Sequence, residues 1–323
     1  MVRLGRLNNL VPTKFTPWKS SYRRSVALPQ TRLITTPPHA LVAKRLPPQP
    51  KVKGFQWSCH FHATPIATAG ATQELKQTLV PSLLQEVREF WFDHLSGEDA
   101  LILPGPNEMK RWFSRDAEFD KACVAQFQPA LETIIASGAT ATEILDAIDI
   151  SLPLNWLSIL LLLDQVPRNC YRGDKSKLVF GLFDPLAEEI ALRAIDAGIP
   201  TQSSDVRYRL SYRFWFQLPL MHSENVAVHE HACKQYEATA GDIEQFLRRE
   251  VASLDGDEKK CYDVLSSQQE ALQGFLNQTY DFEKRHKVII ERFGRYPHRN
   301  QALGRQPTPE ESEYLKKGGE TFT

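Results

Sequence analysis

Acidic residues are absent from the first 73 positions of the chain, whereas eleven Lys and Arg lie between Arg3 and Lys53. All 39 Asp and Glu follow from Glu74 onward, together with 28 Lys and Arg. A segment without acids that is rich in Arg, Ser, Thr and Pro is typical of a mitochondrial transit peptide. We therefore expect residues 1–72 to be a disordered targeting segment removed on import into the mitochondrial matrix, and residues 73–323 to form one domain. The alternative is a cytoplasmic protein with a basic tail.

Cysteines and long apolar runs are also scarce. The five cysteines are scattered and show no C-x-x-C spacing, which excludes a disulfide framework and a zinc ribbon. The longest apolar run, 159–163, falls far short of the roughly 20 residues that a membrane span needs. Glycine-rich phosphate loops, dinucleotide fingerprints and RNA-binding motifs are missing as well. The sequence therefore identifies no cofactor and indicates neither specific nucleic-acid binding nor a membrane span.

Strand signals are nearly absent, and from Pro81 onward apolar residues recur at the three- and four-residue spacing of helices. Ser82 with Gln85 and Thr140 with Glu143 match the capping-box pattern of helix starts. The segment 96–107 reads as a loop. The segment 154–166 is apolar nearly all round and predicts a buried central helix that Pro167 stops.

Further helix signals run to the C-terminus. Asp184 followed by Pro185 predicts a helix start, and Gly198 its end. We expect separate helices at 226–238 and 242–254, then one or two helices over 258–292, and a last helix capped at Thr308. The sequence thus predicts an all-α domain, an antiparallel array of eight to ten helices.

Three segments, 163–173, 218–224 and 292–305, place charged or titratable residues beside proline or glycine next to apolar helices. Together with the strings 89–92 and 315–322, they resemble the signature of the family called domain of unknown function 924, over about residue 80 to the C-terminus. The resemblance implies a tetratricopeptide-like helical fold, and it carries no established activity or catalytic residue.

The three segments also supply the candidate catalytic residues. His222 lies two residues from Glu224, so it could act as a general base oriented by that carboxylate, and His298 is a second candidate base. The alternative is structural, with Ser223 or Glu224 capping a helix and His222 packed against it.

Arginines make up most of the candidate binding residues. Guanidinium groups hold phosphates or carboxylates bidentately, and we expect the segments to meet and form an anion site. The predicted binding residues are Asp164, Arg168, Asn169, Arg172, Arg295, Arg299 and Asn300. The alternative is internal pairing of these arginines with Asp164 or Glu224. His222, Glu224, Asp164 and His298 offer metal-binding atoms, but no metal-ligand spacing is present, so no metal is predicted.

Two functions remain open from the sequence. The first is a binding module that holds an anionic small molecule or an acidic peptide through the arginines. The second is a metal-independent hydrolase that uses His222 or His298 as general base. A closed pocket containing both histidines and the arginines would favour the enzyme, whereas an open site favours binding.

Overall fold

The computed structural model describes residues 69–322, and every regular element in that range is helical. This confirms the all-α prediction, with more helices than the eight to ten expected. The predicted targeting segment, 1–72, lies outside the described residues except for the start of α1 (Ala69–Thr78). Among residues 69–322, no helix combines the length and the apolar character needed to cross a bilayer.

The first part of the domain shows which capping predictions hold. Asp116 accepts hydrogen bonds from the start of its helix, and Thr140 and Glu143 form the expected capping box. The capping box at Ser82 is wrong, because Val80 stands at the N-cap position and makes no side-chain cap. The segment 96–107 is not a loop but holds one helix and the start of another. The elements are α2 (Pro81–Phe92), α3 (Glu98–Ile102), α4 (Pro106–Phe113), α5 (Ala117–Ser137) and α6 (Ala141–Asp146).

The central helix does not stop at Pro167. α7 (Pro153–Leu160) continues into the π-helix η1 (Leu161–Gln165) and then α8 (Val166–Cys170). In an α-helix a proline lacks one N–H and clashes with the carbonyl four residues earlier. Here the N–H of Val166 bonds to the carbonyl of Leu161, five residues back, so a wider turn directly precedes the proline. The chain therefore stays helical up to the polar residues that follow.

A π-helix also precedes Pro185. η2 (Gly173–Lys175) and α9 (Ser176–Leu178) lead into a second π-helix, η3 (Val179–Phe183), and then α10 (Asp184–Asp196). Asp184 is thus not the N-cap that the sequence predicts, because its N–H already bonds to the carbonyl of Val179. The end at Gly198 is confirmed, with φ of 74°. The two π-helices contact each other, which brings Asp164 and Asp184 to one place.

The remaining elements contain one long helix where two were expected. α15 runs unbroken through Gly241, since the buried side chains of Ile243 and Phe246 offset the roughly 1 kcal/mol that an interior glycine costs. The Thr308 capping box is confirmed. The elements are α11 (Ile199–Gln202), α12 (Ser204–Arg207), α13 (Leu210–Arg213), η4 (Phe214–Phe216), α14 (Leu218–Met221), α15 (Val226–Leu247), η5 (Val251–Ser253), α16 (Gly256–Ser267), α17 (Gln269–Phe293), η6 (Pro297–Arg299) and α18 (Pro309–Lys316).

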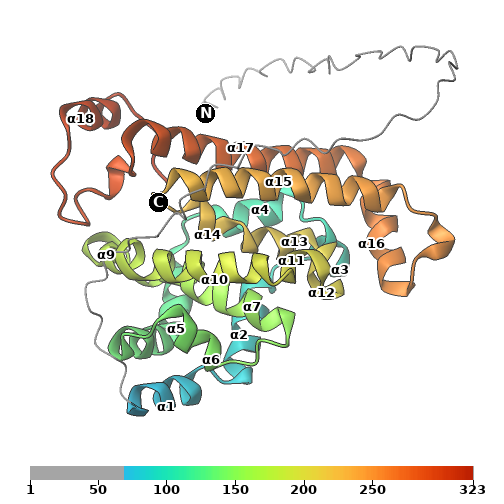
Figure 1. Cartoon of the computed structure of the whole chain (residues 1–323), viewed down its shortest axis with the longest axis horizontal. Helices are drawn as coiled ribbons and strands as arrows, with labels where there is room; N and C mark the ends of the chain where they lie inside the picture. The colour runs from blue at the N-terminus through green and yellow to red at the C-terminus, as the bar shows by residue number, and fades with distance from the viewer. Residues whose placement is uncertain (1–68, 323) are drawn as a thin grey trace, which may run out of the picture. The chain divides into compact units, whose positions relative to one another are not determined.

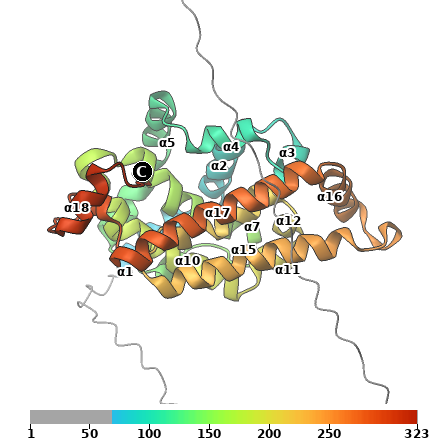
Figure 2. The ribbon, with the colours of Figure 1, turned by 90° about the horizontal axis from the view of Figure 1, so that it is seen from above.

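The helices pack in antiparallel fashion around the buried central segment. α15 and α17 lie side by side and run in opposite directions, joined through α16 (Figures 1 and 2). α14 contacts both α15 and α10, so the end of α14 faces the region where η1 and α10 meet. Leu161, Leu162 and Leu163 of η1 are fully buried in the main core. The polar residues that follow them are therefore anchored by the most buried part of the domain.

Candidate functional site

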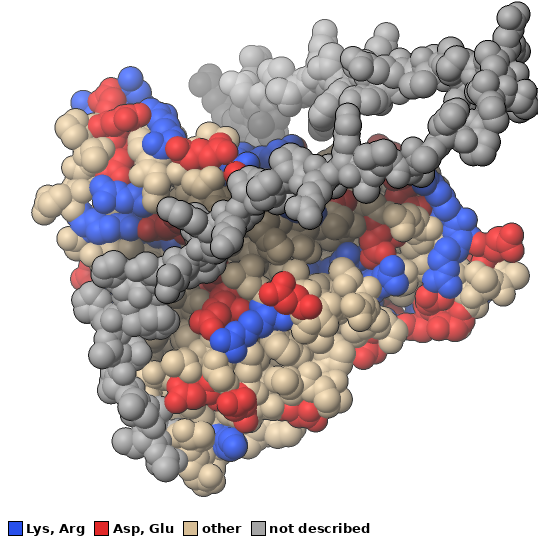
Figure 3. All heavy atoms as spheres, viewed as in Figure 1, with Lys and Arg blue, Asp and Glu red and all other residues tan. Residues whose placement is uncertain are grey.

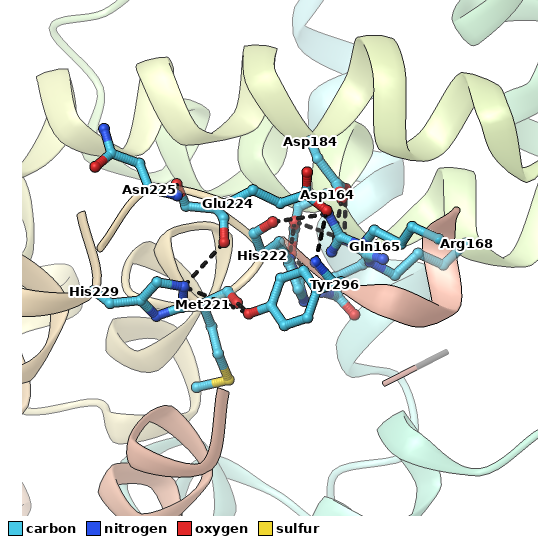
Figure 4. Close-up of polar contacts among 12 residues, drawn as sticks. Asp164, Gln165, Arg168, Asp184, Met221, His222, Glu224, Asn225, His229 and Tyr296 are labelled. Carbon is cyan, nitrogen blue, oxygen red and sulfur yellow. Dashed lines mark hydrogen bonds and ion pairs between the residues drawn. The ribbon is translucent and has the colours of Figure 1, made fainter. Parts of the chain in front are cut away.

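Two buried carboxylates form the centre of the site. Asp164 is 2% exposed and Asp184 is 4% exposed. Nη2 of Arg168 lies 2.5 Å from Oδ1 of Asp184 and 3.5 Å from Oδ1 of Asp164. Nη2 of Arg299 lies 3.3 Å from the other oxygen of Asp184. The side chains of Asp164, Asp184 and Arg168 point toward one another in Figure 4. Two guanidinium groups thus balance two carboxylates, as burial of charge requires.

His222 joins this group through Asp164. Its Nδ1 lies 2.6 Å from Oδ1 of Asp164, and Arg299 donates to its carbonyl oxygen at 3.0 Å. Burial alone would raise the pKa of Asp164, but His222 and Arg168 hold that pKa at about 2. Burial and the charge of Arg168 lower the pKa of His222. His222 is therefore a neutral imidazole at neutral pH, with its Nδ1–H donating to an ionised carboxylate and Nε2 left as the basic nitrogen. We call Asp164, Arg168, Asp184, His222 and Arg299 the charge cluster.

The carboxylate that orients His222 is therefore not Glu224. Glu224 accepts the backbone N–H of Tyr296 at 2.9 Å and both terminal nitrogens of Arg305, at 2.5 and 3.0 Å. Burial opposes ionisation, but the Arg305 hydrogen bonds and the Tyr296 N–H keep the pKa of Glu224 below its usual value. Glu224 thus ties the segment 218–224 to the segment 292–305.

A second buried pair supports the turn that carries His222. Nδ1 of His229 lies 2.7 Å from Oε1 of Glu283, and Nε2 lies 2.9 Å from the carbonyl oxygen of Ser223. Both side chains are fully buried. The carbonyl of Ser223 can only accept, so Nε2 of His229 carries the proton. The hydroxyl of Tyr296 donates to the carbonyl of Met221 at 2.6 Å, beside this pair (Figure 4). These bonds fix the backbone on both sides of His222.

A cavity of about 520 Å³ opens beside the charge cluster. Its wall includes Arg168 and Arg172, two of the arginines named from the sequence, and Arg115, a third arginine that the sequence did not single out. Asp174 is the sole carboxylate among the described residues of the wall. The lining consists of Arg115, Arg168, Tyr171, Arg172, Gly173, Asp174, Ser176, Val179, Phe180, His298, Gln301 and Ala302.

Arg172 makes hydrogen bonds through two of its three guanidinium nitrogens. Its Nε and Nη2 each lie 2.7 Å from an oxygen of Asp120, and Nη2 also donates to Asn169 at 3.1 Å. Asn169 in turn donates to the carbonyl of Gln165 at 3.1 Å, so its role is to position Arg172. Within residues 69–322, Nη1 of Arg172 makes no hydrogen bond, and nor does Nη1 of Arg168.

His298 is the histidine that lines the cavity. Both of its ring nitrogens are buried, and neither makes a well-aligned hydrogen bond to a described residue, although the backbone of Phe322 lies near enough to raise the pKa of the ring slightly. Burial, followed by the charge of Arg299, lowers the pKa of His298 to about 4. The ring is therefore neutral near pH 7 and offers one N–H donor and one acceptor. Buried polar atoms without a partner are uncommon, which makes this position a candidate contact for a ligand.

Arg295 and Asn300, predicted as binding residues, lie outside the cavity wall. Arg295 bonds to both carboxylate oxygens of Glu311, at 2.5 and 2.8 Å, and Asn300 donates to the same carboxylate at 3.2 Å. The backbone N–H of Thr308 also donates to Glu311, at 2.6 Å. These four residues, called the C-terminal clamp below, fasten α18 to the segment 292–305. The three segments therefore meet, but the cavity wall contains residues of the first and third segments and none of 218–224.

Asp164, Asp184 and His222 also offer three ligand atoms within 4.8 Å of one another, a spacing that a metal ion could use. The charges argue against it, because Arg168 and Arg299 already contact these carboxylates. A divalent cation would have to displace the guanidinium of Arg168. The arrangement is that of a salt-bridge network with an imidazole attached.

The uncovered part of the face drawn in Figure 3 carries no broad field of one sign. Lys and Arg are interspersed with Asp and Glu over the face drawn in Figure 3. The arginines of the cavity are therefore a local feature. Local arrangement of donors, rather than net charge, would select a ligand here.

The chain belongs to the family described as bacterial protein of unknown function (DUF924), whose model matches residues 87–319. It is also similar to a solved structure of a protein of unknown function from Agrobacterium tumefaciens, with 28% sequence identity and a TM-score of 0.49. That match covers 73% of this chain and 98% of the other. No curated protein sequence matches the chain.

Proposed function

We propose that this member of the family is a binding protein for a small organic anion, held in the cavity between α8, η3 and η6. The observation that carries the proposal is the wall itself. Arg168 and Arg172 each contribute an Nη1 that bonds to no described residue, beside His298, whose ring nitrogens make no well-aligned hydrogen bond within residues 69–322. Packing alone gives no reason to assemble such donors, since apolar side chains would avoid their desolvation cost.

The cavity favours a small molecule over an acidic peptide. Its volume of about 520 Å³ falls within the roughly 300–1,000 Å³ of small-molecule sites. A peptide would need an extended surface with contacts beyond one pocket.

A metal-independent hydrolase is the second candidate, and the pairing of His222 with Asp164 favours it. That pairing leaves Nε2 as a free base, the arrangement that general-base catalysis uses. A binding function is favoured, however, because neither histidine combines an orienting carboxylate with a place in the cavity wall. His222 is oriented by a carboxylate but is not in the cavity wall, while His298 lines the cavity but has no orienting acid. Binding therefore remains the first proposal.

The experiment is a titration of the full chain with small anions at constant ionic strength, followed by thermal shift and calorimetry. A ligand of the native state raises the melting temperature, by linkage. Arg172→Ala is the variant of choice, because its pair with Asp120 is part-exposed and its loss is expected to cost at most about 1 kcal/mol of stability. Arg193→Ala, which removes a surface pair with Glu189, is the matched control.

We expect anion binding to the native chain and to Arg193→Ala, and its loss from Arg172→Ala. If Arg172→Ala still binds the anion, the anion binds at another site and the proposal is wrong.

A further inference from the structure

The cavity is larger and more apolar than a simple oxyanion requires. A water molecule takes about 30 Å³ in the liquid, and a tetrahedral oxyanion has the bulk of a few waters, so most of the cavity would stay empty around it. Apolar atoms of Val179, Phe180 and Ala302 contribute to the wall. A ligand that fills the site must therefore carry an apolar body as well as its charge.

Phe180 is held in place to receive such a body. The guanidinium carbon of Arg299 lies 4.7 Å from its ring centroid and 4.4 Å from that of Tyr296, so the arginine is sandwiched between two rings. Arg299 is itself fixed by Asp184 and by the carbonyl of His222. A pre-positioned aromatic ring loses little freedom when a ligand packs on it.

The charge of the site limits the charge of the ligand. Arg172 is paired with Asp120, and Arg168 and Arg299 are paired with Asp184 and Asp164. His298 is neutral. A phosphate monoester carries about −1.5 to −2 at pH 7 and would add that charge to a nearly balanced site. A carboxylate adds a single charge, and its two oxygens match two guanidinium donors.

We propose that the cavity takes an amphiphilic monocarboxylate, with its carboxylate on Arg168 and Arg172 and its apolar body against Phe180 and Val179. This inference rests on the proposed anion site and narrows its ligand class. His298 would supply a neutral N–H beside the carboxylate without adding charge.

The test is calorimetric titration of the full chain with a matched series at constant ionic strength. The probes are acetate, octanoate, 3-phenylpropionate, 3-phenylpropionamide, phenyl phosphate and inorganic phosphate. We expect octanoate and 3-phenylpropionate to bind at least about tenfold more tightly than acetate, because single methylene groups already discriminate by about that factor. The amide should not bind, and both phosphates should bind more weakly than 3-phenylpropionate.

Phe180→Ala supplies the second arm, with Leu182→Ala on the same π-helix as control, since Leu182 is outside the wall. We expect Phe180→Ala to weaken 3-phenylpropionate about tenfold and to leave acetate unchanged, with no effect of Leu182→Ala. Phosphates that bind as tightly as 3-phenylpropionate, and are lost in Arg172→Ala, would overturn the ligand class but leave the anion site standing. Absence of binding by every anion would remove both proposals.

Discussion

Arg172 and Arg295 each place two guanidinium nitrogens on one carboxylate, yet the two arginines have different surroundings. Arg295 in the C-terminal clamp bonds to Glu311, which is almost completely buried and also accepts from Thr308 and Asn300. Arg172 bonds to the part-exposed Asp120 and borders a cavity of about 520 Å³. No residue of the clamp lines the cavity, whereas Arg172 lies in its wall together with Arg168 and His298.

The difference shows what separates a structural arginine from a binding arginine. Both residues come from polar segments that follow an apolar helix, and both satisfy a carboxylate. Nη1 makes no hydrogen bond to a described residue in either arginine, so what distinguishes Arg172 is its place in the cavity wall, next to His298. The comparison can be tested by mutating the charge cluster, the cavity wall and the C-terminal clamp separately and measuring stability and anion affinity for each variant.

The largest effect is expected from Asp184→Ala in the charge cluster. The change leaves Arg168 and Arg299 without their shared carboxylate, and Arg299 is 3% exposed. Removing one partner of a buried pair costs about 3–5 kcal/mol, because the remaining charge stays buried. Urea denaturation should show that loss, while Glu189→Ala, in a surface pair on the same helix, should change stability by less than about 1 kcal/mol. An equal, small effect of both variants would show that the cluster does not stabilise the fold.

Glu311→Gln is expected to have the next largest effect, on stability alone. The amide cannot keep the bidentate bond to Arg295, so the clamp should lose about 1–3 kcal/mol. Anion affinity should stay the same, because the clamp does not line the cavity. Arg172→Ala should do the reverse. Denaturation and calorimetry on both variants check this, and a loss of affinity in Glu311→Gln would mean that the two regions act as one.

The fold could be predicted from the sequence where local chemistry decides it. Apolar spacing and the caps at Thr140 and Thr308 depend on residues a few positions apart, and these predictions hold. The proline rule failed at Pro167, because a π-turn provides the room that an α-turn lacks. No local signal distinguishes the two outcomes, since the π-turn depends on packing around it.

The site could be predicted only as a meeting of three segments. The partner of His222 is Asp164, 58 residues earlier, while the neighbouring Glu224 pairs with Arg305. Spacing in the sequence cannot reveal such partners, because tertiary packing of the helices brings them together. Arg115 and Phe180 carry no motif at all, so only the cavity identifies them.

Changes in pH should separate the two regions, because their titratable groups shift in different windows. The pKa of His298 is lowered to about 4, so its neutral form is favoured by the fold. The unfolded state then binds the extra proton, and stability falls as pH drops below about 6.5, by about 1 kcal/mol per unit down to about 4. The pKa of Glu311 is lowered to about 2, chiefly by Arg295, so its contribution is kept above about 4.5 and lost as pH falls toward 2.

Denaturation curves at several pH values check these windows. His298→Asn should reduce the slope between pH 6.5 and 4 without removing it, because the pKa values of His222 and His286 are also lowered. Glu311→Gln should reduce the slope only below about 4.5. An unchanged slope in His298→Asn would show that this histidine is not held neutral by burial.

The smallest effect is expected from Asp120→Asn, and it acts in the opposite direction to the other changes. Asp120 competes with any anion for Arg172, because it occupies Nε and Nη2 of the same guanidinium. An amide of the same shape keeps one acceptor and removes the charge, so the cavity becomes more positive. Part-exposed pairs contribute up to about 1 kcal/mol, which corresponds to roughly a fivefold gain in anion affinity. Calorimetry should find that gain in the native background and none in the Arg172→Ala background. A gain that persists without Arg172 would mean that Asp120 acts on the anion through another cation, and Arg172 would then belong with Arg295 as a structural residue.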